Sequence, residues 1–294
     1  MSAPDSAGRP LRVIVGYDGS PSAVNAIEAA ATLVPSATAS VLHLWEPPFT
    51  SPELRQRLAG RASGLQQLGE LLETEGRAEA ERLAGNGVKL ARAAGWEAEP
   101  MVKRAFGGDG YQFARTAEEM DADLVVVGTR GLGGVRAALG SVSELVVHVS
   151  PVPVLVVPYP LTTSEWAAAT SGPVLVGTDG SAGAARAIDS AAALFPSRRQ
   201  LLVAVAEPGP GPGPTAPDGA ELLTVPCSGR PGSARATAST LAETAANRGA
   251  AVVVVGSRGR SASRELLVGS VPRALLHCAH RPVLVVPRSP VGTA

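Results

Sequence analysis

Short runs of consecutive apolar residues recur along this chain, separated by longer segments that mix small, apolar and polar residues. Unbroken β-branched runs are typical of parallel strands buried on both faces, and the mixed segments between them are typical of helices. The pattern predicts strands at 12–16, 39–44, 97–103, 123–127, 152–157, 174–177, 201–206, 252–255 and 283–286. Strands that alternate with helices indicate an α/β fold whose parallel sheet is covered on both faces.

The predicted helices carry sequence signals at their ends. Ser20 is a good N-cap and Pro21 a good first residue for a helix over 22–33. An Ala- and Glu-rich stretch over about 53–94 ends at Gly95, as expected of a glycine that follows a helix. Further helices are predicted over 110–119, 142–149 and 182–194, and one more opens at Gly269-Ser270.

The chain consists of two similar halves. RVIVGYDGS at 12–20 is repeated as PVLVGTDGS at 173–181. The 294 residues also fit two domains of about 150 residues each. We therefore expect domain 1 over 1–158, a polar linker over 159–172 and domain 2 over 173–294.

The halves differ between their second and third strands. Domain 1 has about fifty residues there, whereas domain 2 has the tract GPGPGPTAPDG at 209–219. Alternating prolines remove backbone donors and clash with the preceding turn, so this tract does not form a helix. We expect domain 2 to lack one covering helix, and its bare sheet face to meet the other domain or a second subunit as a homodimer.

The composition excludes several classes of protein. Twenty-six basic side chains balance twenty-six acidic ones, and aromatic residues make up 3%, so nothing indicates nucleic-acid binding. Two cysteines are too few for a disulfide framework. The N-terminus has no apolar secretion signal, and the longest apolar runs fall short of the ~20 residues of a membrane span. We expect a soluble, cytoplasmic protein without a membrane span.

The candidate chemistry lies in a cassette that occurs twice. Gly256-Ser257-Arg258-Gly259 follows an apolar strand, and Gly269-Ser270 then opens a helix. The first half carries the same elements at 128–131 and 140–141. Glycines at a strand end let backbone amides approach a phosphate, and a helix start attracts the same anion. No Lys follows the last glycine, so this is not a Walker loop.

With these motifs, both halves resemble the universal stress protein family, in its tandem, ATP-binding type. The resemblance rests on the repeated glycine spacing, the GSV that follows it and the closing PVLVVP. It implies two Rossmann-like domains, each with a five-stranded parallel sheet of order 3-2-1-4-5 and a nucleotide at the point where strands one and four diverge. It also implies that the two fifth strands pair antiparallel within the chain.

The resemblance implies the following ligand contacts. Asp18 and Asp179 would lie on the adenine–ribose side, and Leu44 and Val205 would contact the adenine. The remaining candidates for cofactor binding are Gly16, Gly128, Arg130, Gly131, Gly140, Ser141, Val142, Gly177, Gly256, Arg258, Gly259, Gly269, Ser270 and Val271. The two arginines are candidate phosphate contacts or, equally, solvated loop residues.

Each half departs from the family pattern in a different place. In the first half only 132–139 separate the two glycine turns, one residue fewer than 260–268 in the second half. One residue rotates a helix by about 100°, which is enough to misdirect an amide unless the loop absorbs the difference. The Gly133-Gly134 pair gives the loop the freedom to do so. The second half lacks the flexible Gly133-Gly134 pair and has Ala251 where the first half has Asp123.

Three functions remain open. The first is a stress-response regulator that binds ATP or ADP and whose nucleotide occupancy tunes contacts with an unknown protein partner. The second is a slow ATP hydrolase, in which Asp18 and Asp179 would hold Mg²⁺; we expect at most weak hydrolysis, because backbone amides alone do not position a water. The third is a nucleotide-free interaction module, because strand–glycine–helix turns also serve packing alone. We assign no catalytic residue.

Overall fold

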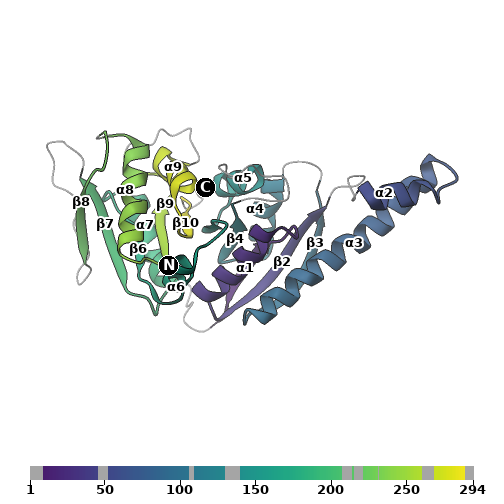
Figure 1. The fold of residues 1–294 in the computed structure, drawn as a ribbon, viewed down its shortest axis with the longest axis horizontal. Coiled ribbons are helices and arrows are strands. Elements are labelled where there is room, and N and C mark those ends of the chain that lie inside the picture. Colours follow the sequence, from purple (N-terminus) through teal and green to yellow (C-terminus); the bar gives the residue numbers. More distant parts are fainter. Residues whose placement is uncertain are drawn as a thin grey trace, which may run out of the picture.

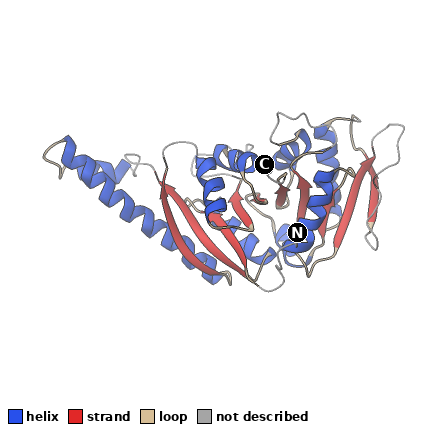
Figure 2. Ribbon diagram, turned by 180° about the vertical axis from the view of Figure 1, so that it is seen from behind, coloured by secondary structure: helices blue, strands red, loops and turns tan. Residues whose placement is uncertain are grey.

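One twisted sheet runs through the whole molecule. The computed structural model describes residues 9–45, 52–105, 109–129, 140–206, 214, 221–230, 232–259 and 268–288. Within them ten strands form a single sheet of order β3-β2-β1-β4-β5-β10-β9-β6-β7-β8. Each half therefore has the order 3-2-1-4-5 implied by the resemblance, and the strands within a half are parallel. Figure 2 shows the strands of both halves between layers of helices.

The first half follows the predicted alternation closely. Its elements are β1 (Leu11–Gly16), α1 (Pro21–Leu33), β2 (Ala37–Trp45), α2 (Pro52–Ala59), α3 (Leu65–Ala93), β3 (Glu97–Arg104), α4 (Asp109–Glu119), β4 (Leu124–Gly128), α5 (Ser141–Val149) and β5 (Val154–Val157). Ser20 caps α1 by accepting the N–H of Ala23 at 3.2 Å, as predicted. Gly95 has φ +99°, a backbone conformation that favours glycine and ends α3.

The second half repeats this order. Its elements, after α6 (Thr163–Ser171), are β6 (Val174–Gly177), α7 (Ala182–Leu194), β7 (Gln200–Ala206), β8 (Leu222–Pro226), α8 (Ala234–Asn247), β9 (Val252–Gly256), α9 (Ser270–Cys278) and β10 (Val283–Val286). The sequence analysis had left β8 and α8 unassigned. Apart from Pro214, the Gly/Pro tract at 209–219 lies outside the described residues.

The structure differs from the sequence-based expectation at the linker. The segment 159–172 contains the helix α6, which begins at a capping box: the backbone N–H of Thr162 donates to Glu165 Oε2 at 2.6 Å. Trp166 of α6 packs against the apolar core that includes α1 and α7. The linker is therefore a structural element of the interdomain junction rather than a plain polar connection.

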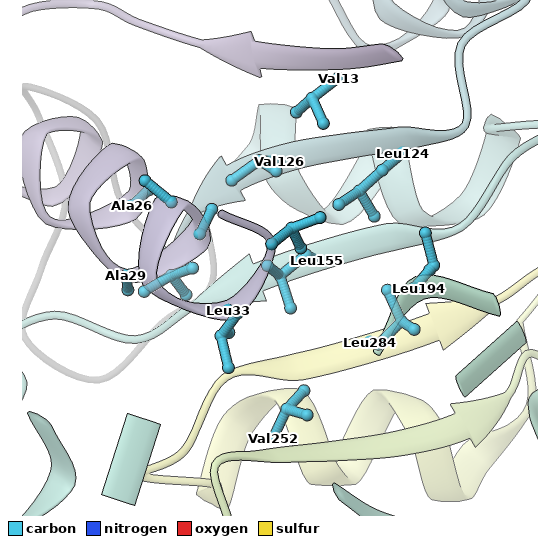
Figure 3. Packing of buried hydrophobic residues seen from close by; sticks show 14 of the residues in the cluster. Val13, Ala26, Ala29, Leu33, Leu124, Val126, Leu155, Leu194, Val252 and Leu284 are labelled. Atoms are coloured by element: carbon cyan, nitrogen blue, oxygen red, sulfur yellow. The ribbon is translucent and has the colours of Figure 1, made fainter. Parts of the chain in front are cut away.

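The fifth strands join the two halves, as predicted. β5 and β10 pair antiparallel, with Leu155 opposite Leu284. The strands on either side of this pair consequently run in opposite directions, and the halves are related by a pseudo-two-fold axis. In Figure 3 Leu33, Leu155, Leu194 and Leu284, two from each half, lie close together at this junction. All four are buried.

Two apolar cores cover the two faces of the sheet, and each includes residues of both halves. One core contains α1 and α7 together with strand residues such as Val13 and Val174. The other contains residues of α4, α5, α8 and α9 with strand residues such as Ile14 and Val253. The alternation of side chains along each buried strand explains why adjacent residues belong to different cores.

Helix α3 distinguishes the first half. It packs on β2 and β3 through small and apolar residues about one turn apart, namely Leu72, Gly76, Ala80, Ala84, Val88 and Ala91. Its outer end and α2 project from the body of the molecule (Figure 1). Between β7 and β8 only Pro214 and Glu221 belong to the described residues. The predicted lack of one covering helix in domain 2 therefore falls on residues that the structure does not describe.

Candidate functional site

The first strand of each half ends in the same turn. In the first half the N–H of Ser20 donates to Asp18 Oδ1 at 2.9 Å, and in the second the N–H of Ser181 donates to Asp179 Oδ1 at 3.0 Å. This Asx turn fixes each carboxylate at the carboxyl end of its strand. Both aspartates are partly exposed. Next to Asp18, burial and the aspartate charge raise the pKa of Tyr17.

The strand register places the two predicted adenine contacts equivalently. Gly16 is opposite Leu42, and Gly177 is opposite Val203. Leu44 and Val205 each lie two residues beyond these positions and are half-buried on the face of α4 and α8. The structure thus places Leu44 of β2 beside the end of β1, which Asp18 follows. It places Val205 of β7 beside the end of β6, which Asp179 follows.

The glycines at the strand ends serve close packing. A Cβ on Gly16 would lie 2.8 Å from the Phe113 ring, and one on Gly177 would lie 3.2 Å from Leu241. Gly128 fits directly against Ser22, the second residue of α1, and Gly256 fits against Gly183, the second residue of α7. Sequence reasoning had assigned these four glycines to nucleotide contact. In the structure their first physical role is to let a helix approach a strand.

One hydrogen bond closes the glycine cassette identically in the two halves. The N–H of Gly140 donates to Thr129 O at 2.7 Å, and the N–H of Gly269 donates to Ser257 O at 2.6 Å. The helix start of the first half thus makes the same hydrogen bond as that of the second, although its cassette is one residue shorter. The residues between Thr129 and Gly140 lie outside the described part of the chain.

The helices that follow begin without a side-chain cap. Their N-cap residues are Gly140 and Gly269, which have no side chain to accept the first N–H groups. Ser141 and Ser270, the first helical residues, are exposed, whereas Val142 and Val271 pack partly against the core. Each cassette thus presents first-turn amides and a solvent-facing hydroxyl, which are suitable donors for an anion.

The second half also brings two predicted site residues into contact. A Cβ on Gly259 would lie 2.5 Å from Asp179 Oδ2. The glycine turn therefore lies against the aspartate carboxylate, so that both belong to one site. Arg258 is half-buried beside them. The first-half counterparts Arg130 and Gly131 lie outside the described residues.

Sequence reasoning missed a serine that fixes the first cassette. Ser143 Oγ donates to Gly128 O at 2.7 Å and is buried. The second half has Pro272 at the equivalent position after Gly-Ser-Val. A hydroxyl inside the first turn of a predicted helix, close to a strand-ending glycine, is the signal that could have identified it.

The two cassette helices contact each other across the pseudo-two-fold axis. Glu144 Oε1 of α5 and Arg273 Nη2 of α9 are 3.0 Å apart. These residues occupy equivalent positions in the repeat, since each is the last residue of its motif, GSVSE at 140–144 and GSVPR at 269–273. Duplication has thus placed opposite charges at one repeated position, and they pair.

The other candidate groups have structural partners. His43 Nδ1 lies 2.8 Å from Tyr17 O, and His148 Nδ1 lies 2.8 Å from Glu144 O. Asp123 binds Arg9 bidentately at 2.7 and 2.8 Å and accepts the N–H of Arg12 at 2.8 Å. The difference between Asp123 and Ala251 therefore concerns the anchoring of the N-terminal segment rather than the cassette.

Two absences hold for the described part of the chain. It contains no group of three or more His, Cys, Asp or Glu residues placed to hold a metal ion. It also contains no helix that is both long and apolar enough to cross a membrane.

The comparison with known proteins agrees with this geometry. The sequence profile of the universal stress protein family matches residues 11–158 and 233–287, which include both cassettes. The chain belongs to the universal stress protein family. Membership supports a role in the stress response.

Similar proteins cover one half or the whole chain. Universal stress protein YxiE of Bacillus subtilis (strain 168) is 29% identical over 149 residues, which are 50% of this chain and 97% of that protein. A universal stress protein from Archaeoglobus fulgidus DSM 4304 superposes with a TM-score of 0.63 at 20% identity, over 94% of this chain and 98% of that one. A protein of unknown function from Pseudomonas aeruginosa PAO1 reaches 0.56 at 13% identity, over 95% and 92%. These two solved structures share the fold of the whole tandem chain.

Proposed function

We propose that this universal stress protein binds ATP or ADP in its two cassettes, and that nucleotide occupancy tunes its contacts with a protein partner. The observation that carries the proposal is the repeated hydrogen bond from Gly140 to Thr129 and from Gly269 to Ser257. It holds an uncapped helix start beside a strand end in both halves. Asp18 and Asp179 follow the neighbouring strands, β1 beside β4 and β6 beside β9.

The donors suit a phosphate chain. Backbone N–H groups at a helix start, aided by the helix dipole, are a common anion site. Ser141 and Ser270 add exposed hydroxyls. On the neighbouring strands β2 and β7, half-buried Leu44 and Val205 offer apolar surface suited to a base. Asp18 and Asp179 offer carboxylates suited to ribose hydroxyls.

Regulation through binding fits these residues better than catalysis. Each site has one aspartate, whose Oδ1 already accepts a backbone N–H. A Mg²⁺ ion, if it accompanies the nucleotide, would take most of its ligands from phosphate and water. The two histidines of the first half, His43 and His148, each lie within hydrogen-bond distance of a backbone carbonyl.

The first experiment asks whether nucleotide is bound at all. Purified full-length protein is denatured, the released small molecules are separated by liquid chromatography, and stripped protein is titrated with ATP by calorimetry. We expect released adenine nucleotide and saturable binding with up to two sites per chain. A chromatogram without nucleotide together with a flat titration would refute the proposal and favour the interaction module.

A substitution in the second cassette tests the assigned site. Gly259→Val places a branched side chain on the Asp179 carboxylate, so we expect the titration to lose one site per chain. Gly64→Val is the matched control, because a Cβ there meets nothing within 4 Å. Unchanged stoichiometry in Gly259→Val would locate the nucleotide elsewhere.

A turnover assay separates binding from hydrolysis. Phosphate release from ATP is compared in the wild type, Asp18→Ala and Asp179→Ala. We expect the same background rate in all three. A wild-type rate that falls in either variant would instead support the hydrolase.

A further inference from the structure

A cavity lies on the face of the sheet opposite to the cassette helices. It has a volume of about 530 Å³ and opens where the ends of α1 and α6 meet the segment before β7. In Figure 1, α6 lies below the centre of the molecule, whereas α5 and α9 lie above it. The residues of the lining that bear on its chemistry are Thr32, Ser171, Ser197, Arg198, Arg199 and Arg248.

Arg198 holds this junction together through backbone carbonyl groups. Its guanidinium donates to Thr32 O of α1 at 3.2 Å, to Ala169 O of α6 at 2.8 Å and to Gly172 O at 3.1 Å. Among the described residues no carboxylate pairs with it. Burial lowers the pKa of Arg198. A half-buried cation without a counter-ion is unfavourable, because its desolvation is not compensated by an opposite charge.

Two further arginines increase the positive charge. Arg248 is exposed and takes part in no ion pair of the described residues, and Arg199 has only a 3.6 Å contact with exposed Glu221. The cavity lining itself contains no Asp or Glu. The C-terminal ends of α1, α6 and α8 oppose this charge, because each carries roughly half a negative elementary charge. Three full positive charges exceed that, so the cavity attracts anions.

We propose that this cavity binds a small anion with two or more negative charges, carried on carboxylate or phosphate oxygens. Guanidinium groups pair with such oxygens bidentately, and the hydroxyls of Ser171 and Ser197 supply further donors. The volume lies within the range of ordinary small-molecule sites. The ligand would sit between the two halves and provide the counter-ion that Arg198 lacks.

The cavity depends on both halves of this chain and on the helix between them. By strand register Arg198 corresponds to Ala37 of the first half, since each lies five residues before the partner of the first-strand glycine. Helix α6 also occurs once, between the halves. The pseudo-two-fold axis therefore generates no second copy of the cavity, and we expect one anion per chain.

Calorimetry with citrate and pyrophosphate, at constant ionic strength and without added nucleotide, tests the proposal on the full chain. Arg199→Gln/Arg248→Gln is compared with Arg55→Gln/Arg57→Gln, which removes the same charge from exposed positions of α2. We expect one saturable site for at least one anion in the wild type and the control, and at least about tenfold weaker binding in the cavity variant. The anion that binds identifies carboxylate or phosphate chemistry.

A second variant separates loss of anion binding from loss of folding. Ser197→Asp places a carboxylate in the cavity, so we expect a raised melting temperature without ligand and loss of anion binding. The proposal is overturned if neither anion saturates the wild type, or if all variants bind equally. ATP binding by the same variants is measured in a separate titration. A failure to bind ATP would concern the cassettes alone and would leave the anion result unaffected.

Discussion

Glycine has two distinct physical roles in this molecule at the scale of single residues. At Gly16, Gly128, Gly177 and Gly256 a missing Cβ lets a helix or an aromatic ring approach a strand end. At Gly140 and Gly269 the missing side chain leaves a helix start uncapped. A sequence shows both kinds as the same letter, so only the structure separates packing glycines from those that expose donors.

Two glycines of α3 provide a matched test of this distinction. A Cβ on Gly87 would lie 2.7 Å from Val41 Cγ1 and 2.8 Å from the Tyr17 ring, whereas one on Gly85 would meet nothing within 4 Å. We expect Gly85→Ala to raise the free energy of unfolding by about 0.5–1 kcal/mol, because alanine favours the helix. We expect Gly87→Ala to lower it by about 1–3 kcal/mol through overpacking.

Urea unfolding monitored by circular dichroism measures both changes. Because the two positions are two residues apart in one helix, each variant is the control for the other. A stabilised Gly87→Ala protein would show that α3 does not pack on β2 as described.

At the scale of elements, the contact between α5 and α9 depends on a divergence within the repeat. Glu144 and Arg273 pair at 3.0 Å from equivalent positions. Arg273→Glu would place two carboxylates across the axis, and we expect the free energy of unfolding to fall by up to about 1 kcal/mol, as for other partly exposed pairs. The charge exchange Glu144→Arg/Arg273→Glu should restore most of the loss, which a double-mutant cycle measures.

The interpretation of this cycle depends on salt. The loss in Arg273→Glu should shrink when the ionic strength is raised from 0.05 to about 1 M, because exposed charges are screened over a few ångströms. A loss that the charge exchange leaves unrepaired would assign Arg273 a packing role instead.

Helix α6 shows where element prediction from the sequence failed. Its Ala/Thr/Ser composition resembles a polar linker, yet Thr162 and Glu165 form the capping box that announces a helix. That signal was present at 162–165 and was outweighed by the composition. β8 was missed for a different reason, since a short apolar segment after a Gly/Pro tract has no periodicity to distinguish it.

At the scale of the whole molecule, the two halves share one sheet and both cores. If one half were removed, the buried apolar residues of β5 or β10 in the other half would lose their strand partner. We therefore expect a single calorimetric unfolding transition with equal van't Hoff and calorimetric enthalpies. Leu284→Ala, at the centre of the junction, should lower the free energy of unfolding by about 2–5 kcal/mol while keeping one transition.

Two resolved transitions in the wild type would contradict this expectation and would mean that the halves unfold independently. Val271→Ala is a suitable control for Leu284→Ala, because Val271 is only partly buried and belongs to α9 rather than to the β5–β10 pair. We expect a smaller loss there.

The sequence by itself determined the alternating strands and helices, the duplication and the cassette residues. The buried strands have uninterrupted apolar runs, and a turn requires particular residues at particular positions, so both leave local signals. The strand order and the pairing of the fifth strands came from the family resemblance that these motifs carry.

The tertiary structure alone decided that both cassettes close with the same hydrogen bond, which glycines pack, and that Glu144 meets Arg273. It alone brought Arg198 of one half to the helix ends of the other and formed a cavity around it. These features depend on contacts between residues of different elements, most of them more than sixty positions apart in the sequence. Local periodicity contains no information about such contacts, because it reflects only which face of its own element a residue occupies.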